Sequence, residues 1–146
     1  MLFSQWVYRG AAVYGTVVTL PLFFTEQRFG REHPPAVTHP EFYYGFLGLV
    51  IAWQLAFWVI GGDPVRYRPL MPATFIEKFA FVISTPLLVA LGRTPLFMLL
   101  PVVGDGLLGV LFVAAWRQTP RGPAGAHGPD RPAGAVGAAL PVEDPL

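Results

Sequence analysis

The sequence predicts an all-α integral membrane protein with four transmembrane helices in an antiparallel bundle, followed by a disordered C-terminal tail. The first indication is composition: 53% of the 146 residues are hydrophobic and only 13% are charged, against about 25% charged residues in soluble domains. The second is that the apolar residues form four long segments, each near the ~17–25 residues that cross a bilayer as a helix. The third is that none of these segments has the polar outer face of a helix in a soluble bundle.

The four apolar segments give the predicted transmembrane spans, which cover residues 6–24, 42–60, 75–91 and 96–116. Their connections are two polar loops and one tight turn, at residues 25–41, 61–74 and 92–95. The short last connection makes the third and fourth spans an antiparallel hairpin. Spans and connections together form one transmembrane domain over residues 1–117.

The remaining residues, 118–146, have a different composition. Proline, glycine and alanine dominate and no apolar periodicity is present. Such a segment cannot bury enough apolar surface to offset its conformational entropy. It is therefore predicted to be a disordered tail.

The distribution of basic residues predicts the orientation. Five arginines lie on the side of the N-terminus, the second loop and the start of the tail, and three lie on the other side. Because basic residues in short loops favour the cytoplasm, both termini are expected there. The high content of alanine, glycine, proline and arginine, with a single lysine, is typical of high-GC bacteria, so the expected location is a bacterial inner membrane.

The composition excludes several classes of function. The chain has no cysteine, which rules out disulfides, thiolate chemistry and cysteine-ligated metals. His33, His39 and His127 lie outside the apolar segments, so a haem held by two histidines within the membrane is not expected. We expect no cofactor and no metal. A net charge of +1 gives no basic field for nucleic acid, and the expected partners are membrane lipids, a lipophilic small molecule, and further copies of the chain or a membrane partner.

Asp105 stands at the centre of the fourth apolar segment. At ~1.5 Å rise per residue it lies roughly 16 Å from the end of that segment, which is the middle of a core ~30 Å thick. An ionised Asp there costs about 2.5–3.5 kcal/mol, and its side chain is too short to reach the headgroups. Asp105 is therefore expected to be protonated, to be paired, or to face a polar cavity. The structural alternative is a hydrogen bond to Tyr14, Thr16 or Ser84.

Glu77 is the second acid within the spans. It lies two residues into the third segment, about 3 Å from its cytoplasmic edge. Thr74 and Glu77 form the T-x-x-E pattern of a capping box, in which each side chain bonds a free amide of the first turn. This capping role and a role in a functional site are compatible.

Helix-weakening residues around Asp105 predict a pocket. Pro101 removes a backbone hydrogen bond, and Gly104 and Gly106 lower helix propensity, so the fourth span is expected to bend or open beside the acid. We expect Asp105 and Glu77 to be catalytic residues of a polar pocket on the cytoplasmic side of the midplane, where two acids at different depths can hold different pKa values. The expected substrate-binding residues are Arg9, Tyr14, Gln54, Trp53, Trp58 and Ser84.

Some of these residues also have structural interpretations. Arg9 is close enough to a span end to reach lipid headgroups. Gln54 can form a hydrogen bond between helices, which contributes only ~0.6 kcal/mol on average in membranes. Small residues repeat every four positions, Ala11 and Gly15 in the first span and Gly48, Ala52 and Ala56 in the second, and this spacing favours close helix packing.

Residues 63–87, "DPVRYRPLMPATFIEKFAFVISTPL", resemble the EXPERA family of membrane proteins with four or more spans, which includes sterol isomerases and the sigma-2 receptor. The residues that carry the resemblance are Asp63-Pro64, Pro69, Glu77 and Pro86. The Asp-Pro turn follows the second span here, the spacing from Glu to Pro is longer, and the family's tryptophan after the proline is absent. The resemblance implies a lipophilic ligand beside buried carboxylates and double-bond isomerisation. The chain is also similar to small four-span bacterial proteins.

Three functions are compatible with this sequence. The first is binding of a lipophilic molecule such as a terpenoid or sterol-like lipid, with acid/base chemistry of an isomerase, cyclase or hydrolase at Asp105 and Glu77. The second is a non-catalytic accessory or assembly subunit, in which Asp105 pairs with a cation of a partner. The third is a proton-coupled carrier. The direction in which Asp105 points discriminates among them.

Overall fold

The computed structural model describes residues 2–32 and 37–122 and is all-helical over these ranges. The elements in chain order are α1 (Phe3–Thr19) continued by the 3₁₀ turn η1 (Leu20–Phe24), α2 (Glu26–Glu32), α3 (Pro40–Gly62), η2 (Arg68–Leu70) leading into α4 (Met71–Ala90), and η3 (Leu96–Met98) leading into α5 (Leu99–Gln118). Four stretches are long and apolar enough to cross a membrane, namely Phe3–Phe24, Pro40–Gly62, Arg68–Ala90 and Leu96–Gln118. The predicted all-α class and its four span-length helices are confirmed.

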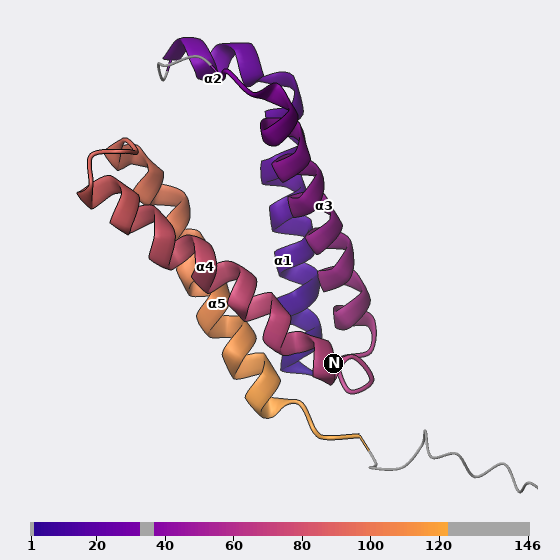
Figure 1. Ribbon diagram of the computed structural model, residues 1–146. Coiled ribbons are helices and arrows are strands. Elements are labelled where there is room, and N and C mark those ends of the chain that lie inside the picture. Colours follow the sequence, from indigo (N-terminus) through magenta and orange to yellow (C-terminus); the bar gives the residue numbers. More distant parts are fainter. Residues whose placement is uncertain (1, 33–36, 123–146) are drawn as a thin grey trace, which may run out of the picture.

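The four long helices form two pairs that meet at one end and diverge toward the other (Figure 1). Helix α1 packs along α3, and α4 packs along α5. The two pairs contact each other mainly through α1 and α5, with few contacts between α3 and α4. The N-terminus and the α3–α4 connection lie at the end where the pairs meet, and α2 lies at the far end of the α1–α3 pair.

An aromatic core holds the two pairs together. The Tyr8 ring of α1 stacks on the Phe112 ring of α5 with centroids 4.5 Å apart, and Phe57 of α3 lies edge-on to Phe112 at 4.9 Å. All three side chains are fully or almost fully buried. The Tyr8 hydroxyl also lies 2.8 Å from Thr74 Oγ1 of α4. Aromatic pairs in such arrangements add about 0.5–1.5 kcal/mol beyond their buried area, so this core contacts all four helices and fixes the junction.

The turn between α4 and α5 depends on a glycine. Gly92 has φ +67°, and the amides of Gly92 and Arg93 donate to the carbonyls of Val89 and Leu88, both at 2.9 Å. These two bonds form a Schellman motif, whose left-handed residue is usually glycine because a Cβ is unfavourable there. The predicted tight turn at this position is present.

Two of the predicted boundaries are wrong. Residues 25–41 were expected to be a loop but contain α2, whose exposed Arg28 and Glu32 form an i,i+4 ion pair at 2.7 Å. That hydrogen bond raises the pKa of the Arg28 guanidinium. The third candidate membrane span begins at Arg68 instead of residue 75, because Pro69 and Pro72 lie in first-turn positions, where proline has no amide bond to lose.

The predicted capping box at Thr74 is also wrong. Since α4 begins at Met71, Thr74 lies inside the helix, and its hydroxyl donates to the Met71 carbonyl at 2.7 Å. Its single proton is used there, so Tyr8 donates the bond that joins the Tyr8 and Thr74 hydroxyls. Glu77 points away from the helix start.

The fourth span was expected to bend or open beside Asp105, but helix α5 does not. It is continuous from Leu99 to Gln118. Pro101 falls in its first turn, where backbone amides have no intrahelical partner. Beyond α5, Thr119 is buried and its carbonyl accepts a 2.9 Å bond from Arg68 Nε. The predicted tail beyond residue 122 lies outside the described residues.

Candidate functional site

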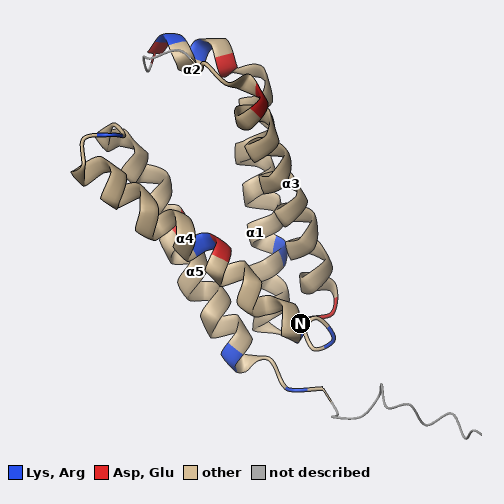
Figure 2. Cartoon of the chain, in the orientation of Figure 1, with Lys and Arg blue, Asp and Glu red and all other residues tan. Residues whose placement is uncertain are grey.

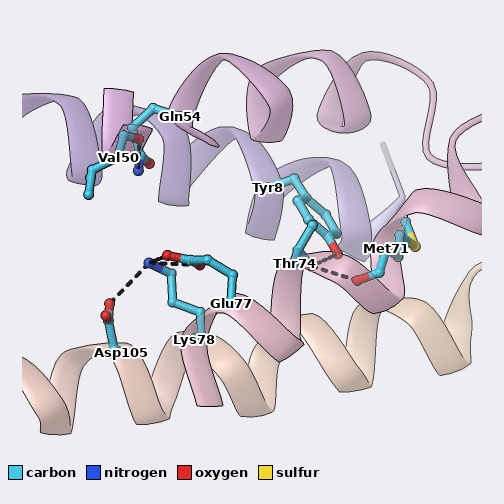
Figure 3. A network of polar contacts seen from close by, with 8 residues as sticks. All are labelled: Tyr8, Val50, Gln54, Met71, Thr74, Glu77, Lys78 and Asp105. Atoms are coloured by element: carbon cyan, nitrogen blue, oxygen red, sulfur yellow. Dashed lines mark hydrogen bonds and ion pairs between the residues drawn. The ribbon is translucent and has the colours of Figure 1, made fainter. Parts of the chain in front are cut away.

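Three charged side chains meet between α4 and α5. Lys78 Nζ lies 3.2 Å from Asp105 Oδ1 and 3.3 Å from both carboxylate oxygens of Glu77. Figure 3 shows Glu77 and Lys78 on α4 and Asp105 on α5, with the ammonium between the two carboxylates. The single ammonium therefore pairs with two carboxylates, and the cluster carries a net charge of −1 when all three groups are ionised.

The cluster lies near the middle of both helices. At ~1.5 Å per residue, Glu77 is roughly 14 Å from Arg68, where its span begins, and Asp105 is roughly 14 Å from Leu96. Glu77 was expected about 3 Å from a span edge; the earlier start of the helix moves it to the level of Asp105. In Figure 2 the charged residues gather at the helix ends and in the connections, with few along the middle of the four long helices.

The ammonium is buried more deeply than its partners. The Lys78 side chain is 7% exposed, and those of Glu77 and Asp105 are 23% and 26% exposed. Burying a lysine is costly unless its charge is paired, and pairing with two carboxylates offsets that cost. The two acidic side chains are partly exposed, although Glu77 Oε2 is itself buried without a hydrogen-bond partner.

Aromatic side chains of the other helix pair lie near the cluster. Lys78 Nζ lies 5.7 Å from the Phe57 ring centroid, close enough for a cation–π interaction. Trp53 is one turn from Phe57 on α3 and contacts its ring, with the centroids 5.9 Å apart. From α1, the Tyr14 hydroxyl lies over Gly104, where an added Cβ would be 3.5 Å away. The cluster thus sits beside the aromatic core, where the two helix pairs begin to separate.

The expected structural hydrogen bonds to Asp105 are replaced by the ion pair. The Thr16 hydroxyl donates to the Ala12 carbonyl, and the Ser84 hydroxyl donates to the Phe81 carbonyl. Both hydroxyls therefore satisfy their own helices. Of the three states predicted for Asp105, the structure contains the paired one.

The predicted site residues fall into two groups. Asp105, Glu77, Tyr14 and Trp53 lie at or near the charge cluster, between the helix pairs. Gln54 and Trp58 line a separate groove on the α1–α3 pair, and the Arg9 guanidinium lies over the Trp58 ring. Ser84 is exposed on α4 and belongs to neither group.

Lys78 is the residue of this cluster that the sequence prediction missed. As the only lysine in the chain and the direct neighbour of Glu77, it could have been identified as the counter-charge of an intramembrane acid. The boundary set at residue 75 placed it near a span edge, where lysine is ordinary. The correct helix start gives it the same depth as Asp105.

Comparison of the chain with protein-family models, curated protein sequences and solved structures gave no match. The described residues also hold no group of three or more metal-binding side chains. Two carboxylates and one ammonium provide acid, base and counter-charge within hydrogen-bond distance.

Proposed function

We propose that the protein is an integral membrane protein that binds a lipophilic molecule where its two helix pairs separate and exchanges a proton with it at the Glu77–Lys78–Asp105 cluster. The observation that carries this proposal is the position of Lys78 Nζ, 3.2–3.3 Å from two carboxylates. Membrane insertion is supported by four span-length apolar helices. The excess of arginine at the end that holds both termini favours cytoplasmic termini and an antiparallel arrangement of the spans.

The charge balance of the cluster is the first argument for proton exchange. Two carboxylates and one ammonium leave one uncompensated negative charge, which is unfavourable in a low-dielectric environment. Binding of one proton makes the cluster neutral. Because Lys78 bridges both acids, that proton can reside on Glu77 or on Asp105 while the other acid stays ionised as a base.

The accessibility of the acids is the second argument. About a quarter of each acidic side chain is exposed, while the lysine is almost fully buried. Glu77 Oε2 is itself buried without a hydrogen-bond partner. The acidic side chains are thus more accessible than the lysine, which is placed to hold their charges. Trp53, which is only partly buried beside Phe57, adds apolar and π surface of the kind that binds hydrophobic molecules and stabilises positive charge.

A double-bond isomerisation is one reaction that such a cluster can support. One acid adds its proton to an alkene carbon, which leaves a carbocation, and the other carboxylate removes a proton from a neighbouring carbon. The proton count of substrate and cluster is unchanged, and no redox partner is required. This is also the reaction that the EXPERA resemblance implies.

The accessory-subunit function is less well supported by this geometry. It needs Asp105 to pair with a cation of a partner, but Asp105 already pairs with Lys78 of its own chain. Proton-coupled transport shares the cluster with our proposal and differs in requiring net movement across the membrane.

Ligand capture tests the proposal. The wild-type protein, Asp105→Asn, Glu77→Gln and the control Glu41→Gln, an exposed acid at the start of α3, are purified in mild detergent. Lipophilic molecules that copurify are identified by mass spectrometry. We expect a molecule that is enriched with wild type and Glu41→Gln and depleted with both cluster variants. The same set of molecules at the same level in all four samples would contradict the proposal.

Infrared difference spectroscopy across a pH titration tests the proton. Wild type is expected to show a carbonyl band of a protonated carboxylic acid that is altered by Asp105→Asn or Glu77→Gln. Glu41→Gln is expected to leave this band unchanged. A band that none of the three substitutions affects would place the proton elsewhere.

A further inference from the structure

We propose that the groove on the outer face of the α1–α3 pair binds one acyl chain of an anionic phospholipid and that Arg9 binds its phosphate. The groove is distinct from the charge cluster, and none of its lining residues is acidic or basic. The inference rests on the membrane insertion in the proposed function, but not on the proton chemistry of the cluster.

The shape and lining of the groove suit a hydrocarbon chain. It encloses about 350 Å³ and is open on one side, with walls formed by Val13, Val17, Ile51, Leu55 and Trp58. Most of these walls belong to side chains that are half or more exposed, whereas the floor of Ala12 and Gln54 is buried. The groove is therefore a surface slot and not part of the core.

Both polar side chains in the groove donate a hydrogen bond within their own helix. The Thr16 hydroxyl donates to the Ala12 carbonyl at 2.8 Å, and Gln54 Nε2 donates to the Val50 carbonyl at 3.0 Å. Gln54 also packs against Gly15, where any Cβ would collide with its amide. Since these donors are used, the slot offers apolar contact and little hydrogen bonding, which is the requirement for an acyl chain.

Arg9 stands at one end of this slot. It precedes Ala12 and Val13 by one helical turn, so it lies on the stripe of α1 that borders the groove. Its guanidinium carbon is 5.6 Å from the centroid of the Trp58 ring. Gly61 allows this approach, because a Cβ at Gly61 would lie 2.8 Å from Arg9 Cγ. The cation is thereby held beside the tryptophan that closes the groove.

The guanidinium of Arg9 lacks an anion in the described part of the chain. Its Nε is buried without a hydrogen-bond partner, and no ion pair joins it to a described carboxylate. A buried cationic donor without an acceptor is unfavourable. A phosphate would supply two acceptor oxygens in the planar geometry that arginine binds best.

The position of Arg9 along α1 indicates that this phosphate belongs to a lipid. Arg9 is roughly 9 Å along α1 from Phe3, and its neighbour Gly61 is at the end of α3. A long arginine side chain at this level reaches the headgroup region. From there the groove runs along α1 toward the middle of the span, in the direction that an acyl chain takes from its phosphate.

Short-range fluorescence quenching by brominated lipids tests this site. The protein is reconstituted into phosphatidylcholine vesicles that contain a minor fraction of dibrominated phosphatidylglycerol or, in parallel, dibrominated phosphatidylcholine. We expect stronger tryptophan quenching by the anionic lipid, because its chain lies against Trp58. Arg9→Gln is expected to weaken its apparent affinity roughly tenfold or more. The control Arg66→Gln, at an exposed arginine of the same end, is expected to retain it.

A second pair of variants tests the groove itself. Val13→Phe fills the slot, and Val110→Phe is its matched control at an exposed valine of α5. We expect the excess quenching by the anionic lipid to fall in Val13→Phe and to persist in Val110→Phe. If either variant fails to reconstitute, wild type alone decides: unbrominated phosphatidylglycerol must displace the brominated lipid, whereas soluble glycerol phosphate must not.

The outcomes separate the two proposals. A protein that does not float with vesicles would contradict membrane insertion, and with it the proposed function. A protein that floats but is quenched equally by the two lipids would overturn only the lipid site. Displacement by soluble glycerol phosphate, or an unchanged affinity in Arg9→Gln, would also overturn it.

Discussion

Lys78 Nζ lies 3.2 Å from Asp105 Oδ1, across the interface of two helices that are otherwise almost wholly apolar. This contact answers why an acid stands at the centre of the fourth apolar segment: it is the partner of the single lysine. Glu77 contacts the same ammonium, so the three charges form one unit. Their energetic roles differ, because the lysine is shared and each acid is not.

Removal of the lysine should destabilise the fold more than removal of either acid. Lys78→Met leaves two carboxylates without a cation, and breaking a buried pair in this way costs about 3–5 kcal/mol. Asp105→Asn leaves the Glu77–Lys78 pair intact, so it should cost no more than the ~1.5–3 kcal/mol of one hydrogen bond to a charged group. Unfolding in mixed detergent, followed by tryptophan fluorescence, measures both.

The triple variant Glu77→Gln, Lys78→Met, Asp105→Asn provides the control. It removes every charge of the cluster, and buried ion pairs replaced by uncharged groups often lose little stability. We expect it to be more stable than Lys78→Met alone. A Lys78→Met protein as stable as Asp105→Asn would contradict the shared-cation geometry.

Chemical labelling should detect the burial of Lys78. Its side chain is 7% exposed, and it is the only lysine, so an amine-reactive acetylating reagent can modify only Lys78 and the N-terminal amine. In the folded protein we expect Lys78 to be protected. After denaturation in SDS it should be labelled, as measured by mass spectrometry of the peptide that contains it. Equal labelling of Lys78 before and after denaturation would show an accessible lysine.

Alanine substitutions at two glycines of α3 should have different effects on the stability of the protein. A Cβ at Gly61 would lie 2.8 Å from Arg9 Cγ, 3.1 Å from the Arg9 backbone nitrogen and 3.3 Å from Tyr8 Cβ. Because backbone atoms cannot easily shift, Gly61→Ala should destabilise by about 1–3 kcal/mol. At Gly48 nothing lies within 4 Å of the added Cβ, so Gly48→Ala should be neutral or stabilise by up to ~1 kcal/mol. Thermal unfolding of the two variants measures the difference.

The bond between Tyr8 and Thr74 should contribute measurably to the junction of α1 and α4. Tyr8→Phe removes the donor but keeps the stack on Phe112, so the expected cost is about 0.5–1.5 kcal/mol. Thr74→Val removes the acceptor, and the double variant should cost less than the sum of the two single changes. A double-mutant cycle of unfolding free energies measures the coupling. Strict additivity would mean that the two hydroxyls do not interact.

The small residues spaced four apart in α1 and α3 show what a sequence pattern can and cannot predict about helix packing. Ala11 is buried and Gly15 admits the Gln54 side chain, so the close packing that this spacing favours is present there, between α1 and α3. Gly48 and Ala52 follow the same spacing but are exposed within this chain. The spacing marks a face on which close approach is allowed; whether another helix occupies that face depends on the rotation of α3.

The sequence by itself determined the four apolar helices, the tight turn and the presence of acids within the spans. These features depend on the composition of single segments, because helix length and hydropathy are local properties. It also identified Asp105 as an acid that needs a partner, since the cost of an ionised carboxylate in an apolar segment follows from position alone.

Only the tertiary structure decided which side chains meet. Each residue of a helix advances about 1.5 Å and turns about 100°, so an error of seven residues in the start of the third span displaced Glu77 and Lys78 by roughly 10 Å. With the start at Arg68, Lys78 is level with Asp105 and faces it. The same packing separates residues that were predicted to share one pocket, because Tyr14 lies toward α5 whereas Arg9 lies toward Trp58. Helix rotation and pairing set these contacts, and neither is a property of one segment.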